Sequence, residues 1–253
     1  MGNALAQLVE ATVATDLERS RDLLQEGIDL AEGAGLNRLG GLFRTLMAQI
    51  LVELGDTEGA ALELEGLRAE TAEHEYRVTH HMTRIHWMQA TGDLEGARRL
   101  PERTEPLVRD LGGFAQVYIE PTWRTLAAEL AWAEGDVERA WAEAGRAWWL
   151  SRSGSDMSGL GALEILSRLT EDTDPRWAAE LSGYSAGLRG VLNTASARIG
   201  ALRSRLARTL GGVEAERLIT RGSETPRARI LENMVRWLEP IVPDDVEAGD
   251  WRR

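Results

Sequence analysis

Hydrophobic residues recur along most of the chain at the spacing that places side chains on one face of an α-helix. One such series is Leu42, Leu46, Ile50 and Leu54. No alternating β-branched run of useful length occurs, and no Asn-Gly or Asp-Gly turn joins such runs. The pattern therefore predicts an all-α protein.

A short polar phrase separates these helices and repeats. The phrase Gly-Asp-x-Glu-x-Ala begins at Gly55, Gly92 and Gly135, and weaker copies begin at Thr15 and Thr173. The aspartates of the five copies lie 40, 37, 43 and 38 residues apart. Each aspartate is followed four residues later by a small residue: Ser20, Ala60, Ala97, Ala140 and Ala178. A period near forty residues is typical of a stacked repeat array.

The phrase has a physical interpretation as the turn of a helical hairpin. Glycine ends one helix in a left-handed turn, and the following aspartate caps the free amides of the next helix. The small residue one turn later lets a partner helix approach closely. A two-helix unit of this kind cannot bury its apolar face alone, so we expect the units to stack on one another.

The helical pattern also suggests how the chain is divided. We expect a repeat array over residues 1–190, beginning with a short helix at 3–14, followed by C-terminal capping helices at 191–239. The acidic tail at 240–253 is expected to be disordered. Inside the array, Pro101 is expected to kink or split the second helix of the third unit, because proline removes a backbone hydrogen bond.

Composition excludes several kinds of chemistry. The 253 residues include no Cys, and all 29 basic residues are Arg. A P-loop and a Schiff base both need Lys, and thiolate chemistry needs Cys, so none of these is expected. No apolar run approaches the roughly 20 residues of a membrane span, and no basic segment precedes an apolar block at the N-terminus. We expect a cytoplasmic protein without a cofactor.

The net charge of −12 is unevenly distributed. Residues 1–184 carry 17 Arg against 32 acidic residues, whereas residues 185–237 carry 10 Arg against 4. An acidic array is a poor surface for nucleic acid, so no direct nucleic-acid partner is expected. The basic C-terminal block is expected to complement its acidic neighbour in the same chain.

The turn Gly-Asp-x-x-x-Ala and its two-helix unit resemble tetratricopeptide repeats (TPR). The longer period resembles the repeats in the sensor arm of MalT-like and LuxR-type bacterial transcriptional regulators, which include multidomain ATPase and cyclase relatives. Residues 210–223 and the helix up to Leu238 resemble the usual ending of these arms. The resemblance implies a right-handed α-solenoid of about five TPR-like hairpins with a C-terminal helical cap. The chain departs from the family at Leu8, Ile85 and Leu166, where a small residue is usual. The printed sequence includes neither the NTPase domain nor the helix-turn-helix of these regulators, so we expect either a fragment or a stand-alone relative.

The same resemblance implies a function and a binding surface. It implies a non-enzymatic scaffold that binds a protein or peptide partner, the interaction or effector-sensing part of a bacterial regulator in signalling. The alternative is a sensor that binds a small molecule in the concave groove. In the family the first helix of each hairpin lines this groove, which here implies Thr45, Gln49, Met82, His86, Gln89, Thr125, Glu129 and Trp132.

Three other features of the sequence resemble functional sites. Gly183-Tyr184-Ser185-Ala186-Gly187 matches the Gly-x-Ser-x-Gly elbow of hydrolases, which gives a distant alternative with Ser185 as nucleophile, but no His follows it in the chain. His74, His80, His81 and His86 lack the three- or four-residue spacing of a helical metal site, so no metal is expected. Arg84 lies among these histidines and leaves an anion or an aromatic ligand open. The nine Trp residues are interpreted as packing between repeats, with an exposed Trp as a contact surface as the alternative.

Overall fold

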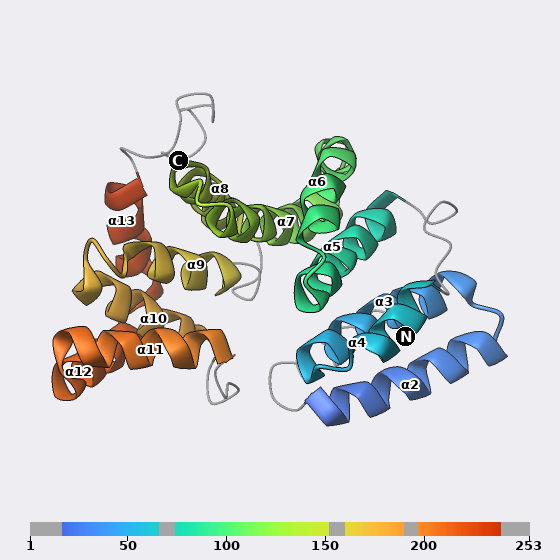
Figure 1. Ribbon diagram of the computed structural model, residues 1–253, viewed down its shortest axis with the longest axis horizontal. Coiled ribbons are helices and arrows are strands. Elements are labelled where there is room, and N and C mark those ends of the chain that lie inside the picture. Colours follow the sequence, from blue (N-terminus) through green and yellow to red (C-terminus); the bar gives the residue numbers. More distant parts are fainter. Residues whose placement is uncertain (1–16, 66–73, 152–159, 190–196, 239–253) are drawn as a thin grey trace. The chain divides into compact units, whose positions relative to one another are not determined.

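The computed structural model describes residues 17–65, 74–151, 160–189 and 197–238 (Figure 1). Every regular element in these ranges is an α-helix, which confirms the all-α prediction. The chain divides into two compact units, Met1–Gly112 and Gly113–Arg253. None of the helices described is long and apolar enough to cross a membrane. The predicted helix at 3–14, the predicted boundary at residue 190 and the predicted tail at 240–253 lie outside the described residues.

Unit 1 consists of helices that pack in sequence order. Helix α2 packs on α3, α3 contacts both α4 and α5, and α5 packs on α6. The core between α2, α3 and α4 contains Leu24, Ile28, Phe43, Ile50 and Ala60, each at most 1% exposed. The bounds of the helices are α2 (Leu17–Gly33), α3 (Asn37–Leu54), α4 (Thr57–Glu65), α5 (His74–Thr91) and α6 (Leu94–Arg109).

Unit 2 begins with two helical pairs and continues into three further helices. Helix α7 packs on α8, α9 packs on α10, and α9 also contacts both α7 and α8. Its main core contains many alanines, among them Ala128, Ala131, Ala140 and Ala144, all fully buried. The bounds are α7 (Gly113–Ala133), α8 (Val137–Ser151), α9 (Leu160–Thr170), α10 (Pro175–Arg189), α11 (Ala197–Leu210), α12 (Gly212–Ser223) and α13 (Arg227–Leu238).

The repeated phrase folds as the sequence predicts. Gly55, Gly92 and Gly135 all adopt the left-handed conformation, with φ of 82°, 82° and 80°. The next residue is then a helix cap: the Asp56 carboxylate accepts a hydrogen bond from the Gly59 amide at 2.9 Å. The same cap joins Asp93 to Gly96 at 2.9 Å, Asp136 to Arg139 at 3.1 Å and Asp174 to Trp177 at 3.0 Å.

The small residue after each cap is buried in the way the phrase predicts. Its exposed fraction does not exceed 1% in any of the five copies, because a neighbouring helix lies against it. These residues are Ser20, Ala60, Ala97, Ala140 and Ala178. A larger side chain at such a position would push the two helices of the hairpin apart.

Pro101 does not split its helix, so that part of the prediction is wrong. Helix α6 continues from Leu94 to Arg109 through both Pro101 and Pro106. The stripe formed by Ala97, Leu100, Thr104 and Val108 is buried along this helix, which packs on α5. Burial of this stripe offsets the roughly 3 kcal/mol that an internal proline costs.

The C-terminal helices pack on α10. Leu202, Leu206 and Leu218 form a core with Ala178 and Ala179 of α10, while α13 joins the core of α8, α9 and α10. Three ion pairs connect the same elements: Arg205 with Glu171, Arg176 with Glu214 and Arg221 with Glu180. Two arginines of the basic block, Arg205 and Arg221, thus pair with glutamates of the preceding acidic region, as the charge distribution predicts.

Candidate functional site

Five of the predicted groove residues lie on α3 and α5 of unit 1. Thr45 and Met82 are 4% and 7% exposed, so they form part of the core. Gln49 is exposed, and His86 and Gln89 are half-buried. The side-chain oxygen of Gln89 is buried and accepts no hydrogen bond within the described chain. Among these five residues, Gln49, His86 and Gln89 are therefore the ones that a ligand could reach.

The other three predicted residues lie on α7 of unit 2, and two of them share a contact. Arg168 of α9 donates to the Glu129 carboxylate at 3.2 Å, and its guanidinium lies 4.5 Å from the centre of the Trp132 ring. Trp132 is 37% exposed. Thr125 is less available, because its hydroxyl donates to the Pro121 carbonyl and its methyl group faces Gly161 of α9.

Arg168 was not predicted as a site residue, although the repeat period points to it. Glu129 and Arg168 are 39 residues apart, which is one period. Unit 1 has a counterpart: Arg38 of α3 donates to the Tyr76 hydroxyl of α5 at 3.3 Å and lies 5.2 Å from the ring centre. These residues are 38 apart. In both units an arginine on an aromatic ring therefore joins helices one period apart, and such a cation–π contact contributes about 0.5–1 kcal/mol at exposed sites.

A second charged cluster between α7 and α8 is largely buried. Glu120 and Arg124 are 6% and 4% exposed. Arg124 lies 3.4 Å from both Glu120 and Glu143, and Arg146 lies 3.6 Å from Glu120. Buried charges that satisfy one another in this way hold two helices in register, and they leave little surface for a ligand.

Ser185 lies inside α10 and is 2% exposed. A nucleophile elbow needs a sharp turn between a strand and a helix, which a position within a helix cannot provide. The two glycines of the pattern, Gly183 and Gly187, lie against the backbone of α12 at Ile219 and Ser223. Close helix packing therefore accounts for the Gly-x-Ser-x-Gly pattern.

The histidines are partly buried on α5. His80 is 5% exposed, and its Nδ1 atom has no hydrogen-bond partner in the described chain. His81 lies 2.9 Å from the Thr104 hydroxyl of α6. Burial lowers the pKa of both imidazoles, that of His81 to about 4. Within the described ranges no group of three His, Cys, Asp or Glu residues could hold a metal ion, and the His74 side chain lies outside them.

Tryptophans gather where α8, α10 and α13 meet. Trp141 packs edge-on against Trp237 with ring centres 4.6 Å apart, and Trp177 also packs edge-on against Trp237 with ring centres 6.3 Å apart. The buried Trp177 indole N–H has no hydrogen-bond partner in the described chain. A cavity of about 520 Å³ adjoins this cluster and is lined by Asp174, Arg176, Trp177, Glu180, Asn233 and Trp237.

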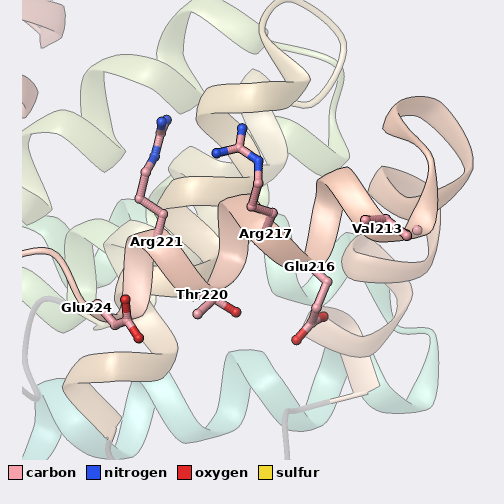
Figure 2. A pocket seen from close by; sticks show the side chains of 7 residues that line it. Val213, Glu216, Arg217, Thr220, Arg221 and Glu224 are labelled. Atoms are coloured by element: carbon pink, nitrogen blue, oxygen red, sulfur yellow. The ribbon is translucent and has the colours of Figure 1, made fainter.

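A larger hollow of about 700 Å³ runs along α12 and is lined from Gly212 to Glu224. Figure 2 shows Arg217 and Arg221 pointing to the side of α12 opposite Glu216, Thr220 and Glu224. Arg217 donates a hydrogen bond to the Glu214 carboxylate, and this hydrogen bond is the main reason why the pKa of Glu214 falls to about 2. Arg221 is paired with Glu180. Both guanidinium groups in this hollow are therefore already engaged by carboxylates.

Comparison with known proteins found no matching family model, no matching curated protein and no matching solved structure.

Proposed function

We propose that the chain is a non-enzymatic TPR-type scaffold, a right-handed α-solenoid of about five hairpins that binds a protein or peptide partner. The proposal includes the family resemblance: the chain would be the interaction or effector-sensing part of a MalT-like bacterial regulator. The observation that carries it is that an arginine lies on an aromatic ring between α3 and α5, Arg38 on Tyr76, and again between α7 and α9, Arg168 on Trp132. Stacked hairpins bring equivalent first helices side by side and would produce such contacts.

Trp132 is the residue on which we expect a partner to dock. It combines a large exposed aromatic surface with a neighbouring arginine, and Trp and Arg are the residue types that dominate binding energy at protein interfaces. Arg168 lies on its ring and is held in place by Glu129. The aromatic anchor is thus ordered before binding, which reduces the entropic cost of association.

The test is a selection of displayed peptides on the full chain, followed by calorimetry of selected peptides with two variants. Trp132→Ala should weaken binding at least tenfold, because a residue of this type contributes about 2 kcal/mol or more at an interface. Leu62→Ala is the matched control, since Leu62 is 71% exposed on α4 and has no proposed role. Peptides that bind Trp132→Ala as tightly as the unchanged chain would overturn the proposal, as would the absence of any selected peptide.

A small-molecule sensor is the second candidate, and the tryptophan cavity favours it. The cavity beside Trp177 and Trp237 joins aromatic rings to polar groups such as Asn233, which is the usual composition of ligand sites. A thermal-shift screen with metabolites would test this candidate. A shift abolished by Asn233→Leu, which replaces the polar amide with an apolar side chain, and kept by Trp132→Ala would place the ligand beside α13 and favour the sensor.

A further inference from the structure

A group of basic side chains lies where α5 meets α6. Arg77, His81 and Arg84 of α5 lie within about 60° of one another around the helix axis, because successive residues are about 100° apart. Arg103 of α6 is close enough for its charge to act on His81. The predicted groove residues of α5, Met82, His86 and Gln89, lie roughly 140° away around the same helix. This basic group is therefore separate from the groove that the proposed function uses.

The hydrogen bonds around His81 determine which of its nitrogens is available. The Thr104 hydroxyl donates its only proton to the Leu100 carbonyl at 2.9 Å. It must therefore accept its second hydrogen bond, 2.9 Å long, from His81 Nδ1. In the neutral ring Nδ1 then carries the proton, and Nε2 has a free lone pair. A proton added at Nε2 would convert this atom into a donor while the bond to Thr104 stays in place.

The charges that act on the pKa of His81 are all positive. After burial, the causes that lower its pKa are positive charges, those of His80, Arg103, Arg84 and Arg77. No carboxylate of a described residue, on α3, α4, α5 or α6, enters this set. Arg84 and Arg103 are exposed and form no ion pair in the part of the chain that the structure describes. These positive charges lie in the acidic part of the sequence, because residues 1–184 carry 17 Arg against 32 acidic residues.

We propose that His81, Arg84 and Arg103, with Arg77 at their edge, bind a tetrahedral oxyanion, a phosphate or sulfate group. Guanidinium groups suit such an anion because their planar N–H donors match its oxygens. His81 would take up one proton from solvent at Nε2 and donate it as a hydrogen bond to the same anion. The arginines would repel a metal cation at this place, so the free Nε2 atom is not the start of a metal site.

The test is an NMR titration of the imidazoles in the full chain with sodium sulfate, at constant ionic strength with sodium chloride. Sulfate keeps its double negative charge across the titration range of histidine. Any pH dependence of sulfate binding therefore arises from titration of the protein. A bound anion favours the imidazolium form and should raise the pKa of His81 by about one unit. Sulfate affinity should therefore increase as the pH falls from about 5, the pKa expected with the anion bound, to about 4, the pKa of His81 without it. His86 serves as the internal reference, because it lies on the other side of α5.

Variants separate a specific site from general screening. Arg84→Gln combined with Arg103→Gln removes two exposed cations and should abolish the response to sulfate, while raising the pKa of His81 in chloride. Arg99→Gln is the matched control, because Arg99 is an exposed α6 arginine already paired with Glu95. A pKa of His81 that responds equally to sulfate and chloride, or that keeps its response in the double variant, would overturn the proposal.

The source of the oxyanion is then decided by a second titration that compares inorganic phosphate with O-phosphoserine. Tighter binding of the ester would identify a phosphomonoester as the ligand, and tighter binding of free phosphate would identify the ion itself. Failure of both to bind, when sulfate does bind, would contradict a phosphate ligand. None of these outcomes depends on Trp132, so this site and the proposed scaffold function can fail independently.

Discussion

Glycine has different roles in the two units. In unit 1, Gly55 and Gly92 lie in turns and adopt left-handed backbone conformations that other residues avoid. In unit 2, Gly135 has the same role, but Gly183 and Gly222 lie inside helices where α10 crosses α12. There a Cβ atom on Gly183 would collide with the Ile219 carbonyl, and one on Gly222 with the Glu180 carbonyl.

The difference shows that unit 2 joins its last helices by contact between backbones. In the helices of unit 1, by contrast, Gly59 and Gly96 meet the aspartates that cap their own helices, and Gly40 meets only a methyl group. The helices of unit 1 instead meet through side chains such as Phe43, Ile50 and Ile85, all at most 1% exposed. The two units should therefore respond differently to added side-chain volume.

The largest effect is expected at the crossing of α10 and α12. Gly183→Ala places a methyl group against a backbone carbonyl that cannot rotate away, and should lower the free energy of unfolding of unit 2 by about 3 kcal/mol. Gly200→Ala is the control, because nothing lies within 4 Å of its Cβ position on α11. That control should stabilise the protein by about 0.5–1 kcal/mol, since alanine favours helix over glycine.

Both effects can be measured by urea unfolding. Trp87 is the only tryptophan in residues 1–112, so tryptophan fluorescence reports mainly on unit 2, while circular dichroism follows both units. A Gly183→Ala variant as stable as Gly200→Ala would show that α10 and α12 do not approach as closely as the structure describes.

The turns could be predicted from the sequence, whereas this crossing could not. A left-handed turn followed by a cap is a local event, so Gly135 and Asp136 identify it within a few residues of chain. A helix crossing brings together residues far apart in sequence, and Gly183 inside a helical pattern first suggested a hydrolase elbow. The path of α6 through Pro101 was missed for a related reason, since its packing on α5 outweighs the local cost of proline.

The sequence predicted less of the candidate site than of the turns. Glu129 and Trp132 were named from the family resemblance and do share a contact with Arg168. Thr45 and Met82 were also named, yet they are buried, because a helix with several buried faces has few positions left for a ligand. The groove residues were predicted from their positions in the repeat alone. The position of a residue in the repeat does not reveal whether its side chain is buried.

The next largest effect concerns the small residues after the turns. Ala140→Leu and Ala97→Leu both overpack positions at most 1% exposed, and each should cost about 1–3 kcal/mol. The cost should be greater at Ala140, because α7 and α8 meet through alanines that leave no flexible side chain to adjust. Urea unfolding monitored by circular dichroism measures both. Equal stability of Ala140→Leu and the unchanged chain would contradict the assigned repeat phase.

A smaller effect is expected from the helix caps, and here the two units should behave alike. Asp93→Ala and Asp136→Ala each remove one capping hydrogen bond, of 2.9 and 3.1 Å, and should each cost about 1 kcal/mol. Asparagine at the same positions keeps an oxygen acceptor and should retain most of the stability. If the losses of stability in the two variants differed by more than about 1 kcal/mol, the two turns would not be equivalent.

The smallest effect is expected from the ion pairs that accompany the C-terminal helices. Arg205 makes a two-pronged contact with Glu171, with N–O distances of 2.7–2.9 Å, but its side chain is 39% exposed. Water and salt screen such a pair, so Glu171→Gln should cost less than about 1 kcal/mol, and the difference should shrink in about 1 M salt. The fully buried Leu202, Leu206 and Leu218 each contribute about 1.5–3 kcal/mol when buried, which salt does not weaken. Salt should therefore leave the C-terminal helices attached to α10. If Glu171→Gln destabilised unit 2 as strongly as Gly183→Ala, the ion pair would contribute more than its exposure allows, and apolar burial would not be the main attachment of the C-terminal helices.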